Sequence, residues 1–126
     1  MEINRPARIY HVCDRATAQR AMAEGLYRPP SLAAEGFIHL SQAHQVQPVI
    51  KAFYAGVPDL VVLAIDPVCL RAPLRYEAAA SMPGFAAGGQ SPVAGQFPHL
   101  YGPLEAHAIC EIVDARAFDP QSANGS

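Results

Sequence analysis

The sequence predicts an α+β fold, because strand-like segments are mixed irregularly with about two amphipathic helices. A run of six apolar residues at 60–65 is typical of a central strand covered on both faces. At 126 residues, of which 51% are hydrophobic and 16% charged, the chain can bury one core. We therefore expect a single domain over residues 1–118, followed by a frayed tail over residues 119–126.

The first part of the chain is expected to hold a strand, a helix and a second strand. Residues 7–13 are rich in β-forming side chains. Asp14 suits the start of a helix, because its carboxylate can accept from first-turn amides, and Gly25 suits the end. We expect a proline-bounded loop at residues 27–31, with room for a short helical turn after it, and a strand at residues 37–41.

A second helix is predicted after Ser41, whose hydroxyl can cap it. Pro48 lacks an amide donor, so this helix is expected to kink there or to restart with Gln47 as its cap. The apolar face of this helix would consist of Val46, Val49, Ile50 and Phe53.

Beyond the central strand, residues 74–78 and 108–113 predict two more strands. Residues 79–96 between them are rich in Ala, Gly, Ser and Pro and carry no charge. Loops of that length are uncommon unless they are functional or disordered, and we expect a long flexible loop of this kind.

Composition argues against two classes of partner. The formal net charge is −2 and the pI is about 6.2, without a run of lysines or arginines, so long nucleic acids are not expected to bind. Small nucleotides need only one or two cations and remain compatible. The first six residues are too polar for a secretory signal, and the longest apolar run is too short to span a membrane.

The cysteines Cys13, Cys69 and Cys110 are odd in number, widely spaced and embedded in apolar sequence. This usage predicts reduced, buried thiols in a cytoplasmic protein. Neither a CxxC nor an HExxH motif occurs, so the sequence predicts no metal site.

Two segments each place an imidazole in apolar sequence with a hydroxyl two residues later, pairing His39 with Ser41 and His99 with Tyr101. A buried polar group without a partner costs about 1–3 kcal/mol, so each histidine is expected to have a partner or a task. We interpret both segments as walls of one polar pocket. Pro98 cannot donate to a sheet, which suggests that His99 lies on an edge strand or in a loop.

The other three histidines receive different interpretations. His11 lies within a predicted strand, on the face shared with Ile9 and Cys13. Two interpretations stay open for it: a core imidazole bonded to a carbonyl, or a wall of the pocket. His44 and His107 are expected on the surface.

Two charged residues are further candidates for the site. Glu77 is the best-placed carboxylate, because it lies in a predicted strand, although an exposed glutamate or a pair with Arg75 would explain it equally well. Arg28 can hold an anionic group, and an exposed loop arginine is its simpler interpretation.

One catalytic pattern is the paired H-x-[S/T] element of two-histidine phosphoesterases, in which one imidazole acts as base and the other as acid. The sequence His39-Leu40-Ser41 fits this element, whereas His99-Leu100-Tyr101 offers a phenol in place of the alcohol.

Several short motifs have a familiar order: IYH at 9–11, EGFIHLS at 35–41, RYE at 75–77 and FPHLYGPL at 97–104. Through them the chain resembles, over roughly residues 8–114, a bacterial family known as domain of unknown function 952. This resemblance implies a fold similar to that of ADP-ribosyltransferases, a split and strongly bent sheet around an NAD-binding cleft. By position, His11 would hold a ribose of NAD. The remaining site residues implied are His39 and Ser41, and then Glu77 or the pair of His99 and Tyr101.

The leading hypothesis is therefore a histidine-lined cleft that binds NAD, as a substrate, or a related ribose-phosphate ligand. In its enzymatic form, His11 and His39 position the ligand, while Glu77 or His99 stabilises or deprotonates the reacting hydroxyl in ADP-ribosyl or phosphoryl transfer. The alternatives are a non-catalytic module that binds a nucleotide or a partner, and the two-histidine phosphoesterase.

Overall fold

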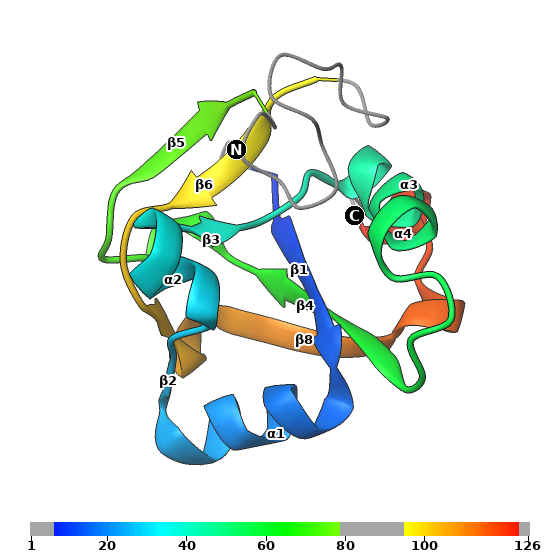
Figure 1. The fold of residues 1–126 in the computed structure, drawn as a ribbon, viewed down its shortest axis with the longest axis horizontal. Helices are drawn as coiled ribbons and strands as arrows, with labels where there is room; N and C mark the ends of the chain where they lie inside the picture. The colour runs from blue at the N-terminus through cyan, green and yellow to red at the C-terminus, as the bar shows by residue number, and fades with distance from the viewer. Residues whose placement is uncertain (1–6, 79–94, 124–126) are drawn as a thin grey trace, which may run out of the picture.

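Residues 7–78 and 95–123 are described by the computed structural model, which is α+β as predicted (Figure 1). In chain order the strands and helices are β1 Ile9–Asp14, α1 Arg15–Glu24, β2 Leu26–Tyr27, α2 Pro30–Glu35, β3 Ile38–His39, α3 Ala43–Phe53, β4 Leu60–Ile65, β5 Leu74–Glu77, β6 Phe97–Leu100, β7 Leu104–Glu105, β8 Ile109–Asp114 and α4 Pro120–Ala123. Within these residues, three helices are longer than one turn, where about two were predicted.

The central antiparallel sheet has the order β1-β4-β8. All six residues of β4 are buried, which confirms the predicted strand covered on both faces. Because side chains alternate along a strand, Val61, Leu63 and Ile65 join one core cluster and Leu60, Val62 and Ala64 join another. Helix α1 packs into the first cluster and α3 into the second, so the two helices cover opposite faces (Figure 1).

A second antiparallel sheet has the order β3-β6-β5, and β2 pairs with β7 in a third. The first two sheets are linked through an isolated backbone bridge. Its hydrogen bonds run between Tyr10 and Ser41, at 2.8 and 2.7 Å. This link brings the start of β1 next to the end of β3.

Helix α1 begins and ends where the sequence predicts. The Asp14 carboxylate accepts a hydrogen bond from the Thr17 amide at 3.0 Å. Gly25 ends the helix with φ +82°, a left-handed conformation that glycine adopts without strain.

Helix α2 corrects the loop expected at residues 27–31. Pro30 is its first residue, where a fixed φ and a missing N–H cost nothing, and Gly36 ends it with φ +89°. The cap of α3 also differs from expectation. Gln42 takes that position, because the backbone of Ser41 is engaged with Tyr10, and the helix continues through Pro48 without restarting.

Pro98 does not place His99 on an edge, because β6 is the middle strand of its sheet. The Pro98 carbonyl accepts from the Leu40 amide at 3.0 Å. The backbone N–H that proline lacks would face the residue just after the two-residue strand β3. Its absence therefore removes only one hydrogen bond between β3 and β6.

Most of the expected long loop, residues 79–94, lies outside the described residues, as do residues 124–126 of the tail. The earlier residues of that tail include α4. None of the helices within the described ranges combines the length and the apolar character that crossing a bilayer requires.

Candidate functional site

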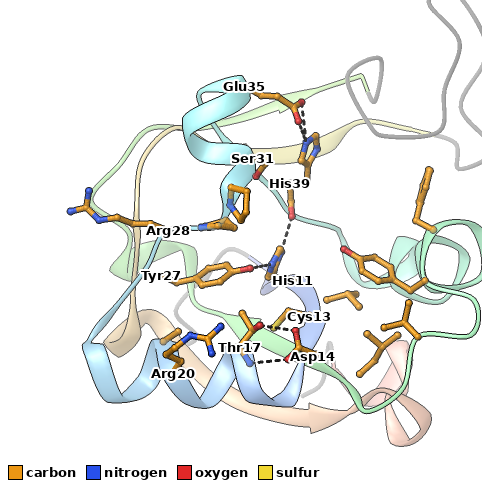
Figure 2. Close-up of a pocket in the computed structure, with 18 of the residues that line it drawn as sticks. His11, Cys13, Asp14, Thr17, Arg20, Tyr27, Arg28, Ser31, Glu35 and His39 are labelled. Atoms are coloured by element: carbon orange, nitrogen blue, oxygen red, sulfur yellow. Dashed lines mark hydrogen bonds and ion pairs between the residues drawn. The ribbon is translucent and has the colours of Figure 1, made fainter.

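A cavity of about 980 Å³ opens among β1, α1, β2, α2 and the end of α3 (Figure 2). Its volume is in the range of small-molecule sites. The wall contains two arginines, three carboxylates, two histidines and three aromatic rings. These residues are Arg20, Arg28, Asp14, Glu24, Glu35, His11, His39, Tyr27, Phe53 and Tyr54.

His11 is hydrogen-bonded at both ring nitrogens. Nδ1 lies 2.8 Å from the carbonyl oxygen of His39, and Nε2 lies 2.8 Å from the hydroxyl of Tyr27. A carbonyl oxygen can only accept, so Nδ1 carries the proton and Nε2 accepts the hydroxyl hydrogen of Tyr27. Both interpretations from the sequence therefore describe His11: it is a buried imidazole bonded to a carbonyl, and it also lines the cavity.

The pair of His11 and Tyr27 is neutral near pH 7. Burial lowers the pKa of His11 to about 4, against a weaker opposing effect of the hydrogen bond to His39. Burial also raises the pKa of the Tyr27 phenol far above neutrality. With both ring nitrogens occupied, His11 can position neighbouring groups but has no free nitrogen to accept a proton.

His39 is held by a carboxylate from the preceding helix. Its Nε2 lies 3.2 Å from each oxygen of Glu35, and the ring is partly exposed in the cavity wall (Figure 2). Gly36 makes this contact possible, because its left-handed turn brings β3 back beside the end of α2. The other nitrogen, Nδ1, is buried, and no group in the described part of the chain donates to it.

His99 forms a second imidazole–carboxylate pair. Oxygen Oε1 of Glu77 accepts from His99 Nδ1 at 2.8 Å and from the Tyr101 hydroxyl at 2.5 Å. The hydrogen bond from Tyr101 lowers the pKa of Glu77 most, and the hydrogen bond from His99 lowers it further. The hydrogen bond to Glu77 raises the pKa of the Tyr101 phenol. Burial lowers the pKa of His99. Arg75, the alternative partner of Glu77, lies instead over the ring of Tyr101, 5.4 Å from its centroid.

The two pairs meet across β3 and β6, where His39 and His99 are directly opposite each other. Their ring centroids are 5.6 Å apart and their planes are nearly perpendicular. The ring of Phe37 stacks on that of His99, with 4.2 Å between the ring centroids. It packs edge-to-face against the ring of His39, with 4.9 Å between the centroids. We call the group of Glu35, Phe37, His39, Glu77, His99 and Tyr101 the histidine cluster.

The structure divides the predicted site residues between the cavity and the histidine cluster. The cavity takes His11 and the exposed Arg28, and the cluster takes Glu77, His99 and Tyr101. His39 belongs to both. Ser41 is buried and its backbone pairs with Tyr10, and it does not line this cavity.

The residues of these sites that were not anticipated include Arg20, Tyr27, Glu35, Phe37, Phe53 and Tyr54. Arg20 on α1 and Tyr27 on β2 both line the cavity. The sequence around them contains no motif that would indicate a site. Glu35 is four residues before His39, but this spacing indicates a contact only within a helix, and here the chain turns between the two residues.

His44 and His107 are exposed, as predicted. The expectation of three buried thiols is wrong for Cys110, which is exposed at the register shift between β4 and β8. Cys69 is half-buried. Cys13 is buried, and burial raises the pKa of its thiol to about 12.

The fold and the site thus define a small α+β protein with a cavity flanked by paired imidazoles and carboxylates. The family described as "Protein of unknown function (DUF952)" matches residues 12–112, and the chain belongs to this family. A search of curated proteins found no match.

Solved structures of protein CC0527 from Caulobacter crescentus are similar to this chain. The sequence in the crystal structure is 31% identical to this chain. The match covers 86% of this chain and 85% of the CC0527 chain, with a TM-score of 0.67. For the solution NMR structure of CC0527 the identity is 32%. The match covers 85% of this chain and 83% of the CC0527 chain, with a TM-score of 0.64.

Proposed function

We propose that the protein binds NAD or a related ribose-phosphate ligand in the cavity and transfers an ADP-ribosyl or phosphoryl group from it. The observation that carries the proposal is the joint presence of arginines, aromatic rings and an imidazole–carboxylate pair around one cavity of about 980 Å³. We also infer a fold of the ADP-ribosyltransferase kind. The division of the strands between sheets joined at Tyr10 and Ser41 supports this inference.

The arginines and rings of the cavity suit the parts of a nucleotide, while Asp14, Glu24 and Glu35 also line it. Arg20 and Arg28 suit the phosphates, because a guanidinium can donate two parallel hydrogen bonds to one phosphate group. Tyr27, Phe53 and Tyr54 offer apolar surface for a base or a nicotinamide ring.

The reacting groups are assigned to His39 and Glu35. In ADP-ribosyl transfer, the glycosidic bond of NAD breaks, nicotinamide leaves, and the acceptor oxygen bonds to the ribose carbon while its proton passes to a base. The Glu35–His39 pair lies in the cavity wall and can take that proton. His11 orients Tyr27 and the backbone of His39. Glu77 and His99 act indirectly in this scheme. Glu77 holds the ring of His99, and that ring packs against His39.

A phosphoesterase is the second candidate, and the direct opposition of His39 and His99 favours it, because such enzymes need an acid and a base on either side of one phosphate. We place either activity in the cytoplasm, where cysteines that form no disulfide stay reduced.

A thermal-shift panel tests binding, with NAD, ADP-ribose, cyclic phosphates and 2′-phosphorylated nucleotides. A ligand present at 100 times its dissociation constant stabilises the fold by about 2.7 kcal/mol. Arg20→Ala and Arg28→Ala should abolish the shift, whereas Arg71→Ala, an exposed arginine outside the cavity, should leave it intact.

The same panel separates the candidates. NAD binding followed by nicotinamide release supports transfer, and loss of release in Glu35→Gln with binding retained supports the assigned base. Hydrolysis of a cyclic phosphate supports the phosphoesterase. Binding without turnover identifies a non-catalytic module, and the absence of any shift overturns the nucleotide proposal.

A further inference from the structure

The histidine cluster contains two buried hydrogen-bond acceptors and no donor for either. The His39 Nε2 and the His99 Nδ1 both face carboxylates, which accept when ionised, so these nitrogens carry the ring protons. The lone pairs are then at His39 Nδ1 and His99 Nε2. Both atoms are buried, and no side chain or backbone group of the described residues donates to them.

The free nitrogens lie on the sides of the rings that face away from the carboxylates. The two nitrogens of an imidazole point in nearly opposite directions. His99 on β6 directs Nδ1 towards Glu77 on β5, so its Nε2 lies on the side of the ring away from that carboxylate. A group between these two rings must offer two donors or a positive charge.

We propose that His39 Nδ1 and His99 Nε2 together bind a first-row transition-metal dication, such as Zn²⁺, between β3 and β6. An ion bonded at about 2.0–2.1 Å to two imidazole nitrogens in tetrahedral geometry holds the ring centroids roughly 5–6 Å apart. The two rings lie at 5.6 Å.

The carboxylates provide the second argument. A metal-bound histidine usually donates its other ring N–H to a carboxylate or a carbonyl, which fixes the tautomer and makes the free nitrogen a stronger ligand. Both imidazoles have this arrangement, through Glu35 and Glu77.

Two protein ligands leave coordination positions for water or a bound molecule. Among the described residues no group of three His, Cys, Asp or Glu side chains could hold a metal ion, so the protein would supply only these two ligands. His39 lines the cavity, which gives such an ion access to whatever the cavity binds. The proposal extends beyond the proposed function and does not depend on the identity of the nucleotide.

The test uses the full chain, stripped of metal with a chelator and titrated with Zn²⁺ near neutral pH. Calorimetry should show one ion per chain, and imidazole ¹⁵N spectra should shift at His39 Nδ1 and His99 Nε2. Mg²⁺ should do neither, because it prefers oxygen ligands. This measurement needs no substitution and is unaffected by any loss of folding.

Substitutions then assign the ligands. His39→Gln and His99→Gln should each weaken Zn²⁺ binding at least about tenfold. The matched controls, His44→Gln and His107→Gln, remove exposed imidazoles and should leave it unchanged. The proposal is overturned if Zn²⁺ does not bind, if the two named nitrogens do not shift, or if only the surface substitutions weaken binding. Nucleotide binding can succeed or fail in any of these cases, so the two proposals are tested separately.

Discussion

The ring of His11 on β1 donates a hydrogen bond of 2.8 Å to the backbone carbonyl of His39 on β3. This bond joins two sheets that otherwise meet at the backbone bridge of Tyr10 and Ser41. It also determines the tautomer of His11, and therefore the direction of the hydrogen bond from Tyr27. The neutral form of His11 thus stabilises both the contact between the two sheets and the position of Tyr27 in the cavity wall.

Acid should destabilise the protein through His11. The unfolded chain takes up a proton near the ordinary pKa of 6.5, whereas the folded protein resists protonation of this ring down to a pKa of about 4. Stability from this group is complete above pH 6.5 and is lost as pH falls towards 4, by roughly 3 kcal/mol. Urea unfolding across this window measures the loss. His11→Gln should flatten that part of the curve, and an unchanged slope would contradict the assignment.

Tyr27→Phe should destabilise the fold by about 1–3 kcal/mol, because the buried Nε2 of His11 loses its donor. The same change should raise the pKa of His11, since the lone pair is no longer engaged. Urea unfolding and an NMR titration of the imidazole measure the two effects. Tyr76→Phe, at an exposed tyrosine, is the control and should change neither.

The three thiols should react with a disulfide reagent in the order of their exposure. Cys110 is exposed and should react first, Cys69 more slowly, and Cys13 only as the protein unfolds, because burial keeps its thiol protonated with a pKa of about 12. Cys110→Ser should remove the fast phase alone. A fast phase that survives this substitution would mean that Cys69 or Cys13, and not Cys110, is the thiol that reacts first.

Gly36→Ala should cost about 1–2 kcal/mol, because alanine disfavours the left-handed backbone at φ +89°. An added Cβ meets no atom within 4 Å there or at Gly25, so both sites measure backbone strain alone. Gly25→Ala is therefore the matched control, with a similar loss of stability. Only Gly36→Ala should also disturb the imidazole ¹⁵N signals of His39, and equal effects on those signals would refute the role of this turn.

Much of the fold could be predicted because its signals are local. The apolar run of β4, the carboxylate of Asp14 and the turn at Gly25 each act within a few residues. The position of β6 could not be predicted, because the cost of Pro98 depends on which strand lies beside it and where that strand ends. The short helical turn expected before Gly36 is α2, but its start at Pro30 was not predicted, because adjacent prolines also suit a loop.

The candidate site was predictable only in part. The sequence indicated that His39 and His99 share a neighbourhood, and they are indeed opposite each other. It could not indicate that Glu35 reaches His39, because that contact depends on a turn, nor that Tyr27 reaches His11, because their separation of 16 residues spans a whole helix.

The stacking of Phe37 on His99 makes the histidine cluster spectroscopically visible. A phenyl ring parallel to an imidazole at 4.2 Å generates a ring current that moves the carbon-bound proton resonances of that imidazole upfield. His44 and His107 are exposed and should resonate near their random-coil positions. A one-dimensional proton spectrum therefore contains an intrinsic reporter of whether β3 and β6 are assembled, without any label or probe.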